Sequence, residues 1–393
     1  MIIEIKGVEF ENKGAHLMLV AIVQQLRQRW PNGQFALTHS AKASHAQRSS
    51  AASLRKINLR KHLLDLNFIS YLLPIWLRSL LKRYGLVTEV DIDMIIDASG
   101  FSYSDQWPSK VRIFHLQNEL QRFDRHIKPY IFMPQAFGPF TTQVSRKRIA
   151  RSFKYAAMIC AREKQSLQHI EELTGSISSL FQFDDFTNLA DGFVPDSFDP
   201  EAEWACIVPN KNMINPRNTS QAWLQRYESV LIGAIAHYRE RGLKPFFLNH
   251  EGAEDGELIA KINGVLDDPI PVMVEFDPLA VKGIIGASRA VLCSRYHGCI
   301  SAMSQGIACI GTSWSHKYEL LYQQYQADGL LLKPNITDAE LRAVIDLSLQ
   351  PDSKEALRIR EQALVLKDKS TAMWSKFQSV TDRYPIFKTS SSQ

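Results

Sequence analysis

Residues 290–311 read AVLCSRYHGCISAMSQGIACIG and contain one complete strand–helix–strand unit. Ala290–Cys293 and Ala308–Gly311 are short apolar runs with the length of buried strands. Between them, Gly298–Gln305 has the length and composition of a short helix. Two strands joined through a helix become parallel neighbours in one sheet. The stretch therefore predicts an α/β protein with a parallel sheet.

The same alternation extends outward along the 393 residues. It predicts strands at Ile2–Phe10, Met94–Ala98, Tyr130–Met133, Ala156–Ala161, Ala205–Val208, Pro245–Leu248 and Val272–Phe276. Helices are predicted at 14–29, 110–123, 145–155, 220–241, 254–266 and 278–287. The segment Asp184–Pro200, rich in Asp, Phe and Pro, interrupts this rhythm. We therefore predict two Rossmann-like domains, 1–200 and 201–393, which face each other across a cleft. The C-terminal helices are assigned to the second domain.

Composition limits the function further. The net charge of +5 and pI of about 8.8 suit an anionic substrate and are too weak to indicate nucleic acid binding. No two of the five cysteines have C-x-x-C spacing, and no cluster has the spacing of metal ligands, so no metal is expected. Met1–Lys6 lacks the layout of a signal peptide. Phe68–Leu81 contains Pro74 and Arg78 and is shorter than the ~20 apolar residues of a membrane span. A cytoplasmic location is expected.

The segment 48–84 differs from the rest of the chain. It contains eight Lys or Arg residues and one acid, Asp65, together with apolar residues such as Trp76 and Leu80. The first interpretation is an insertion of one or two helices whose apolar face packs on the first domain. A second interpretation is a basic amphipathic surface that rests on the inner face of an anionic membrane. A surface for a partner protein is a third.

Polar residues follow the predicted strands closely, and parallel sheets bind ligands beyond the carboxyl ends of their strands. The Ser294–Gly298 run carries the strongest signal, because arginine offers a planar fork for phosphate or carboxylate and histidine transfers protons near neutral pH. The turn before residue 15 opens a helix and adds a lysine, which favours an anion. The candidate site residues in the first half are Asn12, Lys13, Gly14, Gly100, Gln135, Gly138 and Arg162. Those in the second half are His250, Ser294, Arg295, His297 and Lys317.

Structural roles remain open for each of these residues. Arg295 can pair with an acid across the domain interface, and His297 can cap a helix. His250 and Glu251 can be a loop pair on the surface. Arg162 can form a salt bridge with Glu163 at the sheet edge, and Lys317 can be a solvated helix residue. The run from Pro134 to Pro139 can be a rigid turn only.

Taken together, the motifs resemble the polysaccharide pyruvyltransferase family. The resemblance rests on Asn12-Lys13-Gly14-Ala15, on Gly100 after an apolar strand and on Pro134-Gln135-x-x-Gly138-Pro139. It rests also on Ala161-Arg162-Glu163-x-x-Ser166 and on Ser294-Arg295-Tyr296-His297-Gly298 with Lys317 downstream. It spans residues 3 to 320, and the order and spacing of the motifs make it specific. Many members read N-x-G-D in the first loop, where this chain has Ala15, and the segment 48–84 has no counterpart that we recognise.

The resemblance implies a GT-B-like fold. It also implies transfer of pyruvate from phosphoenolpyruvate to a sugar of a bacterial surface polysaccharide, or of its lipid-linked precursor, as a ketal. Phosphoenolpyruvate is then a co-substrate, and no cofactor is expected. Arg295 and His297 are implied to hold the donor, with Arg162 as a partner from the first domain and the first-domain loop on the acceptor side.

Two other functions are compatible with the sequence. A glycosyltransferase of the same fold would use a nucleotide sugar, and Glu319 would be a candidate for holding ribose hydroxyls. A glycan-binding or assembly protein without catalysis would not need Arg162, Arg295 and His297.

Overall fold

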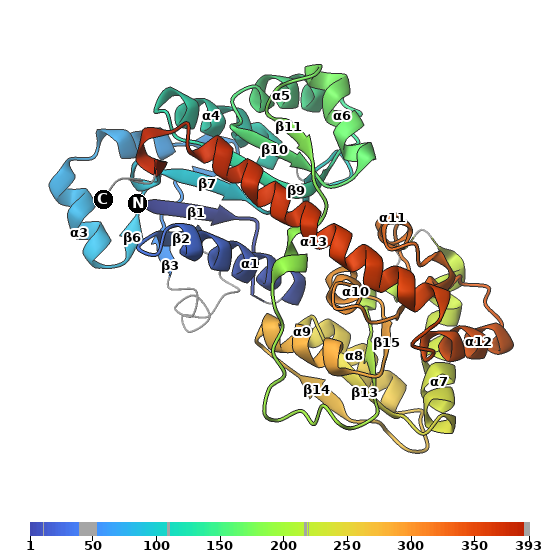
Figure 1. Ribbon diagram of the computed structural model, residues 1–393. Coiled ribbons are helices and arrows are strands. Elements are labelled where there is room, and N and C mark those ends of the chain that lie inside the picture. The colour runs from blue at the N-terminus through green and yellow to red at the C-terminus, as the bar shows by residue number, and fades with distance from the viewer. Residues whose placement is uncertain (11, 39–52, 108–110, 216–217, 219, 389–393) are drawn as a thin grey trace. The chain divides into compact units, whose positions relative to one another are not determined.

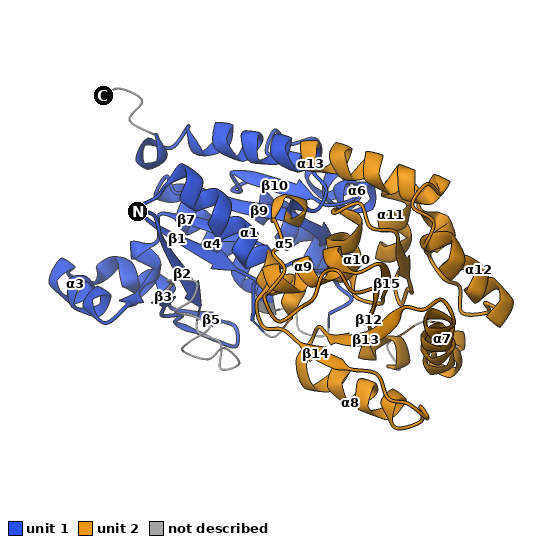
Figure 2. Cartoon of the chain, turned by 60° about the horizontal axis from the view of Figure 1, so that its bottom comes forward, with its two compact units in different colours: residues 1–10, 18–186, 369–393 blue, residues 11–17, 187–368 orange. Residues whose placement is uncertain are grey.

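The computed structural model describes residues 1–10, 12–38, 53–107, 111–215, 218 and 220–388 (Figure 1). The chain forms two compact units (Figure 2). Unit 1 comprises residues 1–10, 18–186 and 369–393, and unit 2 comprises residues 11–17 and 187–368. Each unit has its own parallel sheet.

The first strand of the chain, β1, lies in the middle of the main sheet of unit 1. Its order is β11-β10-β9-β7-β1-β2-β3-β6, and every neighbouring pair is parallel. The chain moves outward from β1 to β6 and then returns to place β7 on the other side of β1, so the strand order reverses between β1 and β7. The strands are β1 (Ile2–Lys6), β2 (Gln34–Thr38), β3 (Ser53–Lys56), β6 (Leu86–Val87), β7 (Met94–Asp97), β9 (Tyr130–Phe137), β10 (Met158–Ala161) and β11 (Leu180–Gln182). The short strand β8 (Phe101–Tyr103) pairs with β9.

Helices α4 (Val111–Arg125), α5 (Gln143–Phe153) and α6 (Lys164–Thr174) cover one face of this sheet. Their apolar residues, such as Phe123 and Phe153, form one buried cluster with Ile95 and Phe132 of the strands. A strand that is buried on both faces of a sheet has a nearly continuous apolar sequence. This is why Met94–Asp97 and Met158–Ala161 were recognisable in the sequence.

The sheet of unit 2 is also parallel, in the order β14-β13-β12-β15-β16. Its strands are β12 (Trp204–Val208), β13 (Lys244–Asn249), β14 (Val272–Val274), β15 (Ala290–Cys293) and β16 (Cys309–Gly311). One face packs on α7 (Gln221–Glu240), α8 (Gly252–Asn263) and α12 (Asp338–Ser348). The other packs on α9 (Pro278–Ala287), α10 (Tyr296–Met303) and α11 (Lys317–Gln324). The predicted α/β class with two Rossmann-like halves is confirmed.

The unit limits differ from the predicted domain limits. The chain leaves unit 1 after Phe186, not near residue 200, and residues 369–393 return to unit 1. The return occurs along α13 (Lys354–Thr381). Near its end, Phe377 and Phe387 pack on Trp30 at ring-centroid distances of 6.3 and 5.1 Å. These aromatic contacts join segments far apart in the sequence, so strand–helix alternation did not reveal them.

The segment 48–84 also differs from its first interpretation; its residues 48–52 lie outside the described part. β3 belongs to the main sheet, β4 (Arg60–Lys61) and β5 (Leu64–Asp65) form a hairpin, and α3 (Ile75–Arg83) follows. No residue of α3 is buried, so its apolar side does not pack on unit 1 as expected. Two predicted surface cations are internal instead: Lys56 pairs with Glu4, and Arg60 pairs with Glu119.

Candidate active site

The loops after the strands of unit 2 carry most of the predicted site. The strand order of this sheet reverses between β12 and β15. In open α/β sheets, the carboxyl ends of the strands at such a reversal form the usual ligand site. The Ser294–Gly298 run leaves β15 at this point, and α10 begins at Tyr296, earlier than the predicted start at Gly298. The fold therefore places Arg295 and His297 where a ligand is expected.

Ser294 anchors this loop to its neighbours. The side chain is fully buried, and its hydroxyl accepts hydrogen bonds from Tyr227 (2.6 Å) and Thr312 (2.8 Å). Its carbonyl accepts from Asn210 Nδ2 and from the Tyr318 hydroxyl, both at 2.8 Å. Four side chains from different elements thus hold the backbone from which Arg295 and His297 project.

Arg295 is buried and paired with two carboxylates. Its Nε and Nη2 donate to Asp255 at 3.0 and 2.5 Å, and its Nη1 pairs with Glu251. Asp255 is fully buried in α8, whereas Glu251, in the loop after β13, is partly exposed. Burial lowers the pKa of Arg295 to about 10, so the guanidinium is charged at pH 7. Arg295 therefore forms a salt bridge, but its partners belong to its own unit and not to another domain as the sequence alternative had it.

The first turn of α1 (Lys13–Arg29) belongs to unit 2 and meets the same loops. The expectation that this turn belongs to the first domain, on the acceptor side, is therefore wrong about the domain, because the turn contacts residues that follow the strands of unit 2. Asn12 caps the helix, because its Oδ1 accepts from the backbone N–H groups of Gly14 (2.9 Å) and Ala15 (3.2 Å). Its Nδ2 donates to Glu251 at 3.0 Å. A Cβ on Gly14 would lie 2.2 Å from His297 Nδ1, so only glycine permits this approach. The expected free N–H groups at the helix start are in part occupied by Asn12.

Burial and neighbouring cations keep imidazoles of this region neutral. Burial lowers the pKa of His250 well below its usual range, and Arg295, His297 and Lys13 lower it further. Burial and Lys13 lower the pKa of His16 to about 4, against an opposing effect of Asp277. His250 is buried, and its Nδ1 has no hydrogen-bond partner among the described residues. Burial is the main cause of both shifts, and the nearby cations add to it.

Two lysines complete the cationic part of the site. Burial lowers the pKa of Lys13, whose Nζ donates to the Phe276 carbonyl at 3.3 Å, while Glu275 and Asp277 oppose the shift. Lys317 begins α11, and its Nζ lies 4.9 Å from the Trp314 ring centroid and 5.1 Å from that of Tyr296. Aromatic faces hold a cation in place without cancelling its charge. The sequence had left Lys317 as a possible solvated residue.

The predicted site residues of unit 1 are joined by hydrogen bonds at the carboxyl ends of the strands of its sheet. The Arg162 N–H donates to the Gln135 carbonyl (3.1 Å), and Gln135 Nε2 donates to the Asp97 carbonyl (3.3 Å). The Gly100 carbonyl accepts from Ala136 at 2.8 Å. The Arg162 guanidinium lies 3.6 Å from Glu163, which fits the structural alternative.

The predicted loop after Met133 begins later than expected. β9 continues through Pro134 and Gln135 to Phe137, because β8 pairs with this extension. Gly138 then adopts a φ of +79°, and a Cβ there would lie 2.5 Å from His169 Nδ1. Gln135 is fully buried, and its Oε1 has no partner among the described residues.

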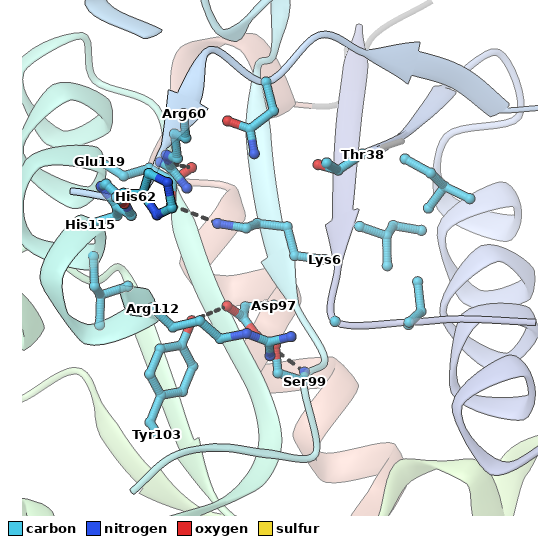
Figure 3. Close-up of a pocket in the computed structure, with 16 residues that line it drawn as sticks. Lys6, Thr38, Arg60, His62, Asp97, Ser99, Tyr103, Arg112, His115 and Glu119 are labelled. Carbon is cyan, nitrogen blue, oxygen red and sulfur yellow. Dashed lines mark hydrogen bonds and ion pairs between the residues drawn. The ribbon is translucent and has the colours of Figure 1, made fainter. Parts of the chain in front are cut away.

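Unit 1 has a polar cavity of about 360 Å³ at the reversal between β1 and β7 (Figure 3). Lys6 and Asp97 line it from the ends of these two strands, and Arg112 and Glu119 line it from α4. Figure 3 shows Lys6 pointing toward Glu119, with the side chain of Arg112 beside Asp97. Further lining residues are Thr38, Asn58, Arg60, His62, Ser99, Tyr103 and His115. The cavity has hydrogen-bonding groups on several sides, as a hydroxyl-rich ligand requires.

The two carboxylates of this cavity, Glu119 and Asp97, are held by ion pairs and hydrogen bonds with other residues that line it. Burial opposes ionisation of Glu119, but Arg60, Lys6 and Lys56 outweigh it and hold its pKa well below the usual range. Lys6 donates to Glu119 at 2.6 Å, and Arg60 lies 2.9 Å from it. Asp97 accepts from the Tyr103 hydroxyl and from Ser99 Oγ, both at 2.6 Å.

Sequence reasoning missed several residues of both regions. Asp255 lies inside a predicted helix, and only the fold brings it to Arg295. Asp97 could have been found, since it is a charged residue at the end of an otherwise apolar strand. Nothing in the sequence around three further residues points to a site; these are Arg60, Arg112 and Glu119. Within the described residues there is no group of three or more His, Cys, Asp or Glu that would hold a metal ion. No helix in the described part of the chain is long and apolar enough to cross a bilayer.

A sequence profile described as polysaccharide pyruvyl transferase matches residues 12–316. The chain belongs to this family. The match begins at Asn12 and extends beyond the Ser294–Gly298 run, so it includes the first turn of α1 and the loops that surround Arg295. Membership identifies the protein as a transferase, with a polysaccharide or sugar as the acceptor that the family implies. A comparison with curated protein sequences gave no significant match.

Solved structures support the GT-B-like fold. The Staphylococcus aureus protein MnaA, solved with UDP, is 13% identical with a TM-score of 0.56, and the match covers 97% of this chain and 96% of that one. A putative UDP-N-acetylglucosamine 2-epimerase from Listeria monocytogenes is 8% identical with a TM-score of 0.59, covering 98% and 96%. The Neisseria meningitidis UDP-GlcNAc 2-epimerase bound to UDP-GlcNAc is 8% identical with a TM-score of 0.57, covering 96% and 100%. At such identities the similarity establishes the fold only.

Proposed function

We propose that this protein transfers the pyruvyl group of phosphoenolpyruvate to two hydroxyls of a sugar and forms a pyruvyl ketal. The supporting observation is the cluster in unit 2, where the cations Lys13 and Arg295 and the imidazoles of His250 and His297 meet at the reversal of the sheet. All four residues lie within the stretch that matches the family. A donor with a phosphate and a carboxylate requires cations, and its enol carbon requires a proton.

The proposed reaction joins phosphoenolpyruvate to two hydroxyls of one sugar. The methylene carbon of phosphoenolpyruvate gains a proton, and C2 becomes an oxocarbenium-like centre. One sugar hydroxyl attacks C2, the C2–O bond to phosphate breaks, and the second hydroxyl closes the ring. One of the two hydroxyl protons returns to the acid that protonated the methylene carbon. The other leaves with phosphate. The products are the ketal and inorganic phosphate.

The residues of unit 2 can be assigned to these steps. Arg295 and Lys13 would hold the anionic groups of the donor, with support from Lys317. Neutral His250, whose Nδ1 has no partner among the described residues, would hydrogen-bond the donor. His297 would transfer the proton to the methylene carbon or take it from the hydroxyl. The predicted role of Arg162 stays a prediction, as do those of Gly100, Gln135 and Gly138.

Glu251 occupies one side of the Arg295 guanidinium, which is the group proposed to bind the donor. Its carboxylate pairs with Nη1, while Asp255 holds the other side of the guanidinium. Asp255 is buried inside a helix and would remain, whereas Glu251 lies in a loop and is partly exposed. We propose that the donor anion replaces Glu251 on Arg295 and that Asp255 keeps the guanidinium oriented.

The variant Glu251→Gln should therefore bind phosphoenolpyruvate about tenfold more tightly, because one negative charge beside the donor anion is removed. Glutamine keeps an oxygen that can accept from Asn12. Isothermal titration would measure the dissociation constant. The matched control is Glu257→Gln on α8, whose side chain is mostly exposed. Weaker binding by Glu251→Gln than by the control would show that Glu251 helps to hold the donor instead of competing with it.

We propose that the cavity of unit 1 binds a sugar residue of the acceptor. It lies at the carboxyl ends of β1 and β7, offers both donors and acceptors, and has a volume within the range of small-molecule sites. The apolar residues Ile5, Val8 and Leu116 also line it and could contact the C–H groups of a sugar ring. A lipid-linked oligosaccharide would present such a residue equally well.

Arg112→Ala should raise the KM for the acceptor about tenfold and leave kcat nearly unchanged, because the side chain would contribute binding and no chemistry. Arg112 is exposed at the cavity and contacts Ser102. Arg125→Ala, on the exposed surface of the same helix, is the control. Steady-state kinetics with a polysaccharide fragment would measure both constants. Equal KM values in the two variants would remove the cavity from the acceptor site.

The first test of the function is a thermal-shift titration with phosphoenolpyruvate, UDP-glucose and UDP-galactose. A ligand that binds only the folded state raises the melting temperature by mass action. We expect a rise with phosphoenolpyruvate that Arg295→Lys reduces. A rise only with a UDP-sugar would support the alternative, a nucleotide-sugar glycosyltransferase of the same fold, and would contradict the proposal.

A further inference from the structure

The helix α3 presents its apolar side to solvent. At 100° per residue, Ile75, Trp76, Ser79, Leu80 and Arg83 fall within an arc of about 140° on one side of the helix. All five are exposed, whereas Leu77, Arg78 and Leu81 on the opposite side are half-buried. A surface helix of a globular protein normally shows the reverse arrangement, with its apolar side toward the core.

The exposure is large for apolar residues of this size. The exposed fractions are 79% for Leu72, 77% for Ile75 and 68% for Trp76, and Tyr84 at the end of the helix is 76% exposed. We call these four residues and Leu80 the α3 patch. Helix α3 lies beside β6, the strand that ends the sheet of unit 1 (Figure 1). Contiguous exposed apolar residues on a protein surface mark interaction sites.

The exposed charged residues of the segment 53–92, which contains the patch, are all cations. Lys82 and Arg83 are exposed at the end of α3. The described carboxylates between residues 53 and 92 are all partly or fully buried and ion-paired. Asp65 and Glu89 pair with Arg122, and Asp91 pairs with Arg78. The exposed surface of this segment therefore offers apolar groups and cations with no exposed carboxylate.

We propose that the α3 patch docks on the surface of an anionic lipid bilayer. Such a surface takes up apolar side chains at the level of its head groups and attracts cations at the rim of the contact. Tryptophan and tyrosine favour this interface because their rings have an apolar body and a polar edge. The cores of protein–protein interfaces, by contrast, are depleted of lysine. The proposal does not depend on the donor chemistry and would bring a lipid-linked acceptor to the enzyme.

Vesicle flotation of the 393-residue protein would test the proposal. The probes are vesicles of phosphatidylcholine alone and of phosphatidylcholine mixed with phosphatidylglycerol. We expect binding to the mixed vesicles and much weaker binding to the neutral ones. Leu72→Ser/Ile75→Ser/Trp76→Ser should lower binding more than about a hundredfold. Lys82→Glu/Arg83→Glu should lower it at least about 25-fold, since each cation near an anionic surface contributes about fivefold.

The control is Leu357→Ser/Leu364→Ser/Val365→Ser, which removes three exposed apolar residues of α13 and should leave vesicle binding unchanged. The thermal shift caused by phosphoenolpyruvate should be equal in all three variants. A failure of the donor proposal can therefore be distinguished from a failure of the membrane proposal. Absence of binding to mixed vesicles by the wild-type protein would overturn the inference. So would equal loss in the control, or a wild-type dimer that the α3 variant converts to a monomer while vesicle binding persists.

Discussion

Replacing His297 by alanine should lower the turnover of pyruvyl transfer by ~10²–10⁴, because a positioned proton-transfer group contributes that much to a rate. The imidazole projects from the start of α10, and its ring lies against the backbone of Gly14. Ser294 and its four partners hold the loop independently of His297. The fold and the binding of phosphoenolpyruvate should therefore survive the substitution. Phosphate release under saturating substrates would measure turnover.

A matched variant separates this effect from a general loss of histidine. His126→Ala changes an exposed imidazole of unit 1 that stacks on Tyr71. It should retain full turnover. If His297→Ala keeps turnover within a few-fold of the wild-type protein, another group transfers the proton, and His250 becomes the first candidate.

Removal of Arg295 should have the largest effect on stability. Arg295→Ala would leave Asp255 buried without its cation, and breaking a buried ion pair in this way costs about 3–5 kcal/mol. Arg295→Lys would keep the charge but lose the planar fork, so this variant should fold and bind phosphoenolpyruvate at least about tenfold more weakly. Chemical denaturation followed by tryptophan fluorescence would measure the stability of both variants, and calorimetric titration would measure binding to Arg295→Lys.

An exposed arginine that also makes two contacts with one carboxylate provides the control. Arg342 contacts Glu240 through both Nη atoms, and both side chains are about half exposed. Arg342→Lys should change neither stability nor donor binding measurably, because solvent screens the pair. Unchanged donor binding in Arg295→Lys would mean that Arg295 serves the fold only, as its pairing with Asp255 and Glu251 permits.

Much of the fold followed from local pattern. Ala290–Cys293 and Pro278–Ala287 have the predicted limits, because buried strands read as apolar runs and Asp277 caps the helix that follows. The C-terminal segment was misassigned, since the contacts of Trp30 with Phe377 and Phe387 join distant parts of the sequence. α3 was misread for a related reason: its apolar side was expected to be covered, and amphipathic periodicity does not state which side faces the protein.

The candidate site divides in the same way. The sequence alone determined that Ser294, Arg295 and His297 lie between a strand and the start of a helix, because residue type and strand periodicity are local properties. Tertiary structure decided that Arg295 pairs with Asp255 and Glu251, that Gly14 lies against His297, and that Lys6, Asp97 and Glu119 surround a cavity. These contacts depend on strand order, because parallel strands bring their carboxyl ends together whatever their separation along the chain. The order of strands in a sheet is set by packing of the whole unit, which no short stretch of sequence encodes.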